Sequence, residues 1–378
     1  MSVHVASVGT GRFGKRAESQ VELAAEAAGL ALEGIGRRPV DLLVVGSMFS
    51  HGPHGREALL PRLAGRLALE SAAGFRVDSS SGTGGMAFHA AALAIESGRF
   101  DRALVVATEK MTDRTTLENT RDLAASLHPD EVAAGATMPG LAAIVTQRYL
   151  QRFGRGVEVL DAATAHARAM ATRNPAAQFF RKPIATAEIA QSRYVAAPLR
   201  LLHCSAISDG ATALVLERGA GPATVLGLGQ GFEALRLIDR DDLTTFGASR
   251  VAAKRAYDAA RLAPKEVEVA EVHDAFSPFL YIHAEDLGLV PPGTAPDALA
   301  NGEFALDGRI PVNPSGGVVG RGHPVAASGL AEVAEVALQL RGEAGGHAVA
   351  RAPRVGLAHA MSGIAAHNFV TLLGREGP

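Results

Sequence analysis

The sequence is poor in several residue types that define common classes of protein. Its 378 residues include one cysteine and no tryptophan. A single cysteine excludes an internal disulfide and any zinc or iron–sulfur site built from several cysteines. The 37 basic residues are balanced by 39 acidic ones. The chain therefore lacks the basic excess of a nucleic-acid-binding face, and nucleic acid is not an expected partner.

Long apolar runs are also missing from the sequence. No stretch approaches the roughly 18 apolar residues that a membrane-spanning helix needs. Residues 1–5 contain no basic segment followed by an apolar one, so no secretory signal is predicted. We therefore expect a cytoplasmic protein that does not enter the membrane.

Short apolar runs alternate with alanine-rich stretches along most of the chain. Residues 41–46, 103–107 and 213–216 are apolar at nearly every position, as in strands covered by helices on both faces. The intervening segments have the composition and spacing of helices. This alternation predicts an α/β fold.

Two pairs of segments resemble each other at an offset of about 230 residues. Residues 24–46 correspond to residues 252–272, each an alanine-rich helix followed by a strand. The glycine-rich residues 77–85 correspond to residues 312–317, each followed by a helix. Shared composition alone would produce some similarity, but two ordered coincidences favour a duplicated α/β domain. The expected halves are residues 1–218 and 219–378.

Residues 112–205 interrupt the first half with a long excursion that contains no βαβ unit. Residues 112–140 are polar and predicted to be irregular, and a helix is predicted through residues 144–153. The proline-bearing residues 174–183 follow. Long excursions from compact folds are usually functional, so residues 174–183 are expected to cover the mouth of a site, although a dimerisation arm fits equally well.

Candidate catalytic residues fall in the glycine-rich turns. Ser81 follows a strand and precedes Gly82 and a helix, where the positive end of the helix dipole favours negative charge. A capping serine at a tight turn would look the same. His323 lies between Gly322 and Pro324 and is a candidate acid or base. The glycine spacing before His323 lacks the Gly-Lys-Ser/Thr ending of a nucleotide loop.

Two further candidates lie at predicted strand ends in the second half. His273 ends the strand that begins near residue 267, at the edge where α/β sites gather. Gly363 follows the last predicted strand and is a candidate backbone N–H donor. His273, His323 and His359 match no metal-ligand spacing, and no metal is expected. The residues that would bind a cofactor cannot be assigned from these patterns.

Taken together, these loops resemble the thiolase superfamily, most closely the sterol-carrier-protein-type and bacterial or archaeal thiolases. The resemblance covers nearly the whole chain. It rests on residues 77–82, 174–178, 207–211, 273–276 and 313–324, in family order. It implies two βαβαβαββ halves in a five-layered α/β sandwich with an inserted loop domain, a homodimer or larger oligomer, and coenzyme A thioesters as substrates, with no covalently bound cofactor.

The resemblance also implies roles for individual residues. His323 would act as the acid/base that activates the nucleophile and would form one oxyanion hole with His273. The backbone N–H groups of Ser81 and of Gly363 or its neighbour would form a second. The family has its nucleophilic cysteine where this chain has Ser81.

A second sulfur of the family is also missing. Its acid/base cysteine is absent both at Ala275 and in residues 360–363, while Cys204 falls in a segment that is structural in the family. A serine hydroxyl ionises far less readily than a thiol, so it needs a base in contact, such as His323 within about 3 Å.

Three functions follow from these departures. The first is a thiolase-like acyl-CoA acyltransferase that uses Ser81 and His323. The second is a non-covalent retro-aldol lyase of β-hydroxyacyl-CoA, which needs oxyanion holes but no sulfur; residues 182–202 and 276–279 resemble steroid side-chain aldolases of the superfamily. The third is a catalytically silent scaffold for a small zinc-ribbon/OB-fold partner, which sulfur-poor relatives often have. Acyl-CoA chemistry is favoured over the scaffold because His273 and His323 are both present.

Overall fold

The computed structural model describes residues 2–36, 38–49 and 58–375. At the centre of the described chain, nine strands are hydrogen-bonded in one continuous series. Two mixed sheets make up this series and join at a single paired register, His4 with Thr224, between β1 and β8. The first sheet has the order β3-β2-β4-β7-β1 and the second the order β8-β11-β10-β9. Each sheet belongs to one half of the chain, which agrees with the duplication expected from the sequence.

The first half supplies five strands and three helices. The strands are β1 Val3–Thr10, β2 Leu42–Gly46, β3 Ala73–Val77, β4 Arg102–Glu109 and β7 Gly210–Arg218. The helices are α1 Gln20–Glu33, α2 Leu59–Arg66 and α3 Thr83–Glu96. Strands β2, β4 and β7 contain the apolar runs that the sequence marked as buried strands, and their residues are almost all buried.

The second half repeats this plan, but the counterpart of β3 is shortened to a single residue pair. Its strands are β8 Thr224–Phe232, β9 Val269–Glu271, β10 Val355–Ser362 and β11 His367–Gly374. Its helices are α9 Gly247–Ala260, α10 Phe279–Asp286, α11 Ala295–Ala300, α12 Gly317–Arg321 and α13 Val325–Arg341. The counterpart of β3 is a single parallel bridge between Val312 and Ala270. Pro314 follows closely and cannot donate to a strand ladder, so the expected strand stops there.

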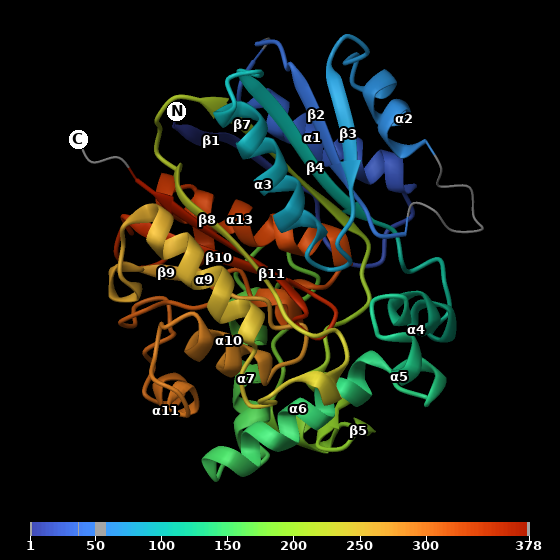
Figure 1. Ribbon diagram of the computed structural model, residues 1–378, viewed down its shortest axis with the longest axis vertical. Helices are drawn as coiled ribbons and strands as arrows, with labels where there is room; N and C mark the ends of the chain where they lie inside the picture. The colour runs from blue at the N-terminus through green and yellow to red at the C-terminus, as the bar shows by residue number, and fades with distance from the viewer. Residues whose placement is uncertain (1, 37, 50–57, 376–378) are drawn as a thin grey trace.

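The layers are arranged as the five-layered sandwich predicts. Helices α3 and α13 pack against each other between the two sheets, α1 covers the outer face of the first sheet, and α9 covers the outer face of the second. Figure 1 shows α3 and α13 in the middle of the molecule. The first residues of both central helices therefore lie close to the loops that carry the candidate catalytic residues.

The excursion forms a helical layer beside the sandwich. It contains α4 Thr116–Ala124, α5 Pro129–Ala133, α6 Met138–Phe153, α7 Glu158–Ala171, α8 Thr186–Gln191, β5 Tyr194–Ala196 and β6 Leu199–Arg200. The prediction that residues 112–140 are irregular is wrong, because they form α4, α5 and the start of α6. Several of their polar residues are helix caps: Thr115 and Glu118 form a capping box, and Thr137 caps α6.

Candidate active site

A cavity of about 240 Å³ brings the predicted loops together. Ser81, His323 and Gly363 all line it, although they are far apart in sequence. Most of the wall is apolar and comes from both halves and the excursion; it includes Met111, Leu123, Met138, Pro139, Val195, Leu201, Ile207, Phe276, Val325 and Met361. The cavity thus offers a few polar groups in an apolar chamber, the usual composition of a small-molecule site.

The turn that carries Ser81 is held in an unusual backbone conformation. Ser80 has a φ of 49°, in the left-handed region that few non-glycine residues adopt. Its N–H donates to Asp78 Oδ1 (2.9 Å), and its hydroxyl bonds Ser126 Oγ (2.6 Å). Ser81 follows directly, just before α3, and its backbone N–H donates to no acceptor in the described part of the chain. This N–H is therefore available to a ligand.

Close packing of the two central helices sets the distance between Ser81 and the loop of His323. A Cβ added at Gly84 would lie 2.1 Å from the backbone N of Leu330 in α13. Gly329 likewise lies so close to α3 that its Cβ would meet the N of Gly85 at 3.0 Å. Only glycine permits this approach of two helix backbones.

His323 is fixed by its backbone and by one ring nitrogen. Its N–H donates to Ser208 Oγ (3.0 Å) and to the carbonyl of Ala206 (3.2 Å), and its Nδ1 pairs with Ser328 Oγ at 2.8 Å. Burial lowers the pKa of His323 well below its usual value, and the neighbouring His273 and Arg321 add to this effect. The imidazole is therefore neutral near pH 7, with Nε2 not engaged by any described residue.

The predicted contact between His323 and Ser81 is not made. Both residues line the cavity, but no hydrogen bond joins the Ser81 hydroxyl to His323 or to any other described residue. Catalytic hydrogen bonds are often long in the absence of substrate and tighten when it binds. The structure thus places the candidate nucleophile and the candidate base in one cavity, but without a hydrogen bond between them.

His273 lies behind His323 and does not line the cavity. The two ring centroids are 5.2 Å apart, and His273 is fully buried. Its Nδ1 lies 2.8 Å from Oε1 of Glu332, a residue of α13 that is also fully buried. Burial lowers the pKa of His273 to about 3, with a further contribution from Arg321. His273 is therefore a neutral ring with a carboxyl group beside it.

His359 orients the backbone of His273. The N–H of His273 donates to Nδ1 of His359 (3.4 Å), and Nε2 of His359 pairs with Oδ1 of Asn368 (2.9 Å). These partners fix the proton of His359 on Nε2, because a backbone N–H only donates and an amide oxygen only accepts. His359 is therefore a structural support and not a metal ligand. No cluster of three metal-binding side chains occurs within the described residues.

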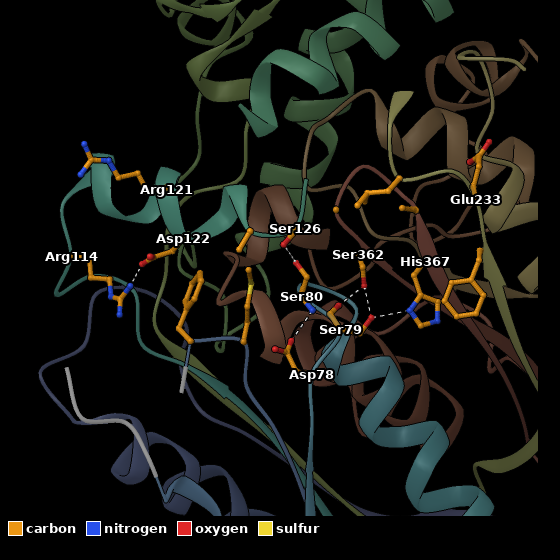
Figure 2. Close-up of a pocket in the computed structure, with 17 residues that line it drawn as sticks. Asp78, Ser79, Ser80, Arg114, Arg121, Asp122, Ser126, Glu233, Ser362 and His367 are labelled. Atoms are coloured by element: carbon orange, nitrogen blue, oxygen red, sulfur yellow. Dashed lines mark hydrogen bonds and ion pairs between the residues drawn. The ribbon is translucent and has the colours of Figure 1, made fainter. Parts of the chain in front are cut away.

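Gly363 is joined to the Ser81 turn by a cluster of hydroxyl and imidazole groups. Ser362 donates to the carbonyl of Ser79, and Ser79 Oγ pairs with Ser362 Oγ (2.8 Å) and with His367 Nδ1 (2.9 Å). Figure 2 shows the bonds among Ser79, Ser362 and His367, and all three residues line a second cavity, of about 690 Å³. The backbone N–H of Gly363 also donates to no described acceptor. The cluster thus ties together the two turns that carry free N–H groups.

Cys204, which was expected in a structural segment, lies on the cavity wall. Its thiol donates to the carbonyl of Arg200 at 3.5 Å. Burial raises the pKa of this thiol to about 12, so it is protonated near pH 7 and is a poor nucleophile. Its presence in the cavity therefore does not replace the sulfur missing at position 81.

The excursion covers the cavity with different residues from those expected. Thr116, Thr120, Met138 and Arg193 line it, whereas residues 174–183 do not. The latter stretch packs beneath the His323 loop instead, where Gln178 donates its N–H to the carbonyl of Arg321 (2.8 Å) and accepts from Ser208 Oγ. The expectation that residues 174–183 cover the mouth is therefore wrong, since they support the loop from behind.

Sequence reasoning missed the polar groups that α13 contributes, chiefly Ser328 and Glu332. They are four residues apart and so lie on one face of a helix whose residues are nearly all buried, and this spacing was the available signal. It also missed Arg321 and Glu271, a buried ion pair with 3.4 Å between Nη1 and Oε2.

In the described part of the chain, no helix is long and apolar enough to cross a membrane.

Comparisons with known proteins identify the family. Residues 3–220 match the thiolase N-terminal domain and residues 229–375 a thiolase C-terminal domain-like family. An acetyl-CoA acetyltransferase of Methanothermobacter thermautotrophicus is 36% identical over 338 residues, 87% of each chain. The benzoylsuccinyl-CoA thiolase subunit BbsB of Thauera aromatica is 31% identical over 382 residues, 96% of this chain and 94% of the relative.

Solved structures share the fold along the whole length. The Ltp2-ChsH2(DUF35) aldolase has a TM-score of 0.83 at 24% identity, covering 99% of this chain and 98% of that one. Human mitochondrial 3-ketoacyl-CoA thiolase has a TM-score of 0.75 at 15% identity, covering 100% and 99%. The matches to both halves, together with the sequence relatives, show that this chain belongs to the thiolase superfamily of acyltransferase enzymes.

Proposed function

We propose that this protein is a thiolase-like acyl-CoA acyltransferase in which Ser81 occupies the position of the nucleophilic cysteine. The observation that carries the proposal is the convergence of Ser81, His323 and Gly363 on one apolar cavity. The two unengaged N–H groups of Ser81 and Gly363 are suited to an oxyanion. His273 supports His323 from behind in this proposal, and a coenzyme A thioester is the substrate, with no bound cofactor.

The transfer step follows from these positions. Nε2 of His323 takes the Ser81 hydroxyl proton as the serine oxygen forms a bond to the thioester carbonyl carbon. The carbonyl oxygen becomes an oxyanion and accepts hydrogen bonds from the two free N–H groups. The C–S bond then breaks, the oxyanion collapses to an ester, and the imidazolium of His323 returns its proton to the thiolate. An external nucleophile reverses these steps and takes the acyl group.

A retro-aldol lyase is the second candidate. It is favoured by the missing hydrogen bond between Ser81 and His323, because a lyase needs no serine nucleophile. In this reaction Nε2 of His323 removes the β-hydroxyl proton, the Cα–Cβ bond breaks, and the electron pair forms a thioester enolate held by the N–H groups. The enolate carbon then takes a proton. The aldolase neighbour has only 24% identity and supports the shared fold alone.

The proposal includes a quaternary assembly. A homodimer or larger oligomer is supported by β3, a sheet-edge strand whose residues 73–75 are exposed. A small zinc-ribbon/OB-fold partner is part of the proposal as well, since one relative is named as a subunit. The proposal also divides the chain into two halves, residues 1–218 and 219–378, and places the protein in the cytoplasm.

Intact-mass spectrometry with acyl-CoA separates these functions. Covalent transfer predicts an acyl adduct on the wild type, no adduct on Ser81→Ala, and a faster one on Ser81→Cys. Ser205→Ala is the matched control, because Ser205 also lines the cavity and is not at a helix N-terminus. Turnover of a β-hydroxyacyl-CoA that survives Ser81→Ala would support the lyase. Absence of adduct and turnover, with or without a zinc/OB-fold partner, would refute both and favour the scaffold.

A further inference from the structure

Ser328 lies in the first turn of α13, beside the imidazole ring of His323. Its side chain is fully buried and does not line the cavity, whereas His323 does. Ser328 Oγ lies 2.8 Å from His323 Nδ1, and the same hydroxyl group donates to the carbonyl oxygen of Pro324 at 3.3 Å. Two hydrogen bonds of one serine thus join the ring of His323 to the backbone of α13.

The backbone of α13 determines which of the two bonds uses the serine proton. A serine within a helix can donate its hydroxyl proton to the carbonyl group four residues earlier, and Pro324 stands four residues before Ser328. A hydroxyl group has one proton, so when it donates to Pro324 it can only accept at its other contact. That contact is with Nδ1 of His323, and Nδ1 therefore has to supply the proton of the bond between them.

The ring of His323 has a single proton to place. Burial lowers the pKa of His323 well below its usual value, and the nearby His273 and Arg321 lower it further, so the imidazole is neutral near pH 7. In a neutral imidazole one nitrogen carries the proton and the other has a free lone pair. A proton on Nδ1 therefore leaves the lone pair on Nε2, the nitrogen that no described residue engages.

We propose that Ser328 is a positioning residue that accepts the Nδ1 proton of His323 and thereby keeps the lone pair on Nε2, where it acts as a base. This inference rests on the proposed function, because it explains why Nε2 is the basic nitrogen in the transfer step. In serine hydrolases a buried carboxylate holds the catalytic histidine in the same tautomer. Here a neutral hydroxyl group has that task, since no carboxylate of the described chain contacts His323.

The proton transfers balance with Ser328 in this role. The O–H bond of Ser81 breaks as an N–H bond forms at Nε2, and the ring of His323 becomes an imidazolium. Its Nδ1–H then donates to Ser328 Oγ as a charged donor, which strengthens the bond while the oxyanion exists. When Nε2 returns its proton to the leaving thiolate, the ring is neutral again and Nδ1 still carries its proton. Ser328 itself neither gains nor loses a proton.

The tautomer of His323 is the direct test, and it needs no substrate. Protein labelled with ¹⁵N-histidine is measured by long-range ¹H–¹⁵N NMR near pH 7, with His323→Asn used only to assign the signal. We expect the wild type to carry the ring proton on Nδ1. Ser328→Ala removes the acceptor, which would leave a buried Nδ1–H without a partner, so the proton should move to Nε2. Ser328→Thr keeps a hydroxyl group and should keep the proton on Nδ1.

Thr371→Val is the matched control. Thr371 Oγ1 also pairs with a ring nitrogen of a buried histidine, Nε2 of His89, at 3.0 Å, and neither of these residues lines the cavity. This variant should change the signals of His89 and leave those of His323 unchanged. A wild-type ring with its proton on Nε2, or an unchanged His323 tautomer in Ser328→Ala, would overturn the inference.

Turnover of an acyl-CoA provides the second measurement. We expect kcat to fall about a hundredfold in Ser328→Ala, less than about tenfold in Ser328→Thr, and not at all in Thr371→Val. KM should stay unchanged in all three variants, because none of these side chains lines the cavity. Circular dichroism checks that each variant is folded. If no thioester reacts with the wild type, the proposed function fails, while the tautomer measurement still decides the role of Ser328.

Discussion

Gly84 lies where α3 crosses α13, and its replacement by alanine should weaken both the fold and the site. A Cβ at this position would lie 2.1 Å from the N of Leu330 and 2.7 Å from the carbonyl oxygen of Ala326. Both atoms belong to the backbone of α13, so no side-chain rotation can relieve the contact. The two central helices would have to separate by more than an ångström, because ordinary contacts begin near 3.4 Å.

The size of the effect is set by two opposing terms. Alanine is favoured over glycine within a helix by about 1 kcal/mol. Overpacking in a close-packed interior is unfavourable by about 3 kcal/mol at the upper end of its usual range, where a contact between two backbones belongs. We therefore expect Gly84→Ala to lose about 2 kcal/mol of unfolding free energy. Turnover should fall as well, since Ser81 lies just before α3 and His323 just before α13.

Gly29→Ala in α1 is the matched control. Both glycines lie within 14-residue helices, but a Cβ at Gly29 would meet nothing within 4 Å. This variant should gain about 0.5–1 kcal/mol. Urea unfolding followed by far-ultraviolet circular dichroism is the suitable assay, because the chain has no tryptophan for fluorescence. Equal stability of the two variants would refute the argument from helix contact.

Three further predictions concern the groups around the cavity. Burial raises the pKa of Asp274 to about 7 in the folded state, so its contribution to stability is present below about pH 4 and is lost as the pH rises through 7. Asp274→Asn should flatten the pH dependence of the unfolding free energy over that window, and it should raise this free energy by up to about 4 kcal/mol at pH 8. An unchanged pH profile would contradict this prediction. Cys204, with its thiol pKa near 12, should resist iodoacetamide below pH 9, and Cys204→Ala should keep full turnover; rapid inactivation by the reagent would show a reactive thiol. Ser362→Ala removes the hydrogen bonds between the Gly363 turn and Ser79. We expect this variant to lower kcat at least tenfold while its unfolding transition stays cooperative. An unchanged kcat would exclude a positioning role for Ser362.

The layered fold was largely predictable from local pattern and repetition. Strands β2, β4 and β7 are apolar on both faces, and buried strands between helical layers have that signature. The helices of residues 112–140 were missed because their polar residues resemble loop residues until the capping partners are known. Thr115 and Glu118 satisfy each other's backbone groups, which a count of polarity does not reveal.

The candidate site was predictable only where glycine or proline marked the backbone. Ser81 and His323 each lie beside such a residue, Gly363 is itself a glycine, and all three line one cavity. Glu332 has no such neighbour, and its burial depends on which face of α13 turns inward. That face is fixed by the packing of α3 through Gly84, a tertiary contact that no local pattern contains.

Several buried carboxyl groups lie near the cavity around a single arginine. Glu332, Glu271 and Asp274 are all buried, with raised carboxyl pKa values, and Arg321 is the cation that they share. Such groups can often be replaced by apolar residues of similar size without loss of stability, because desolvation offsets most of the Coulomb attraction. The buried carboxyl groups of Glu332, Glu271 and Asp274 therefore do not by themselves stabilise the fold.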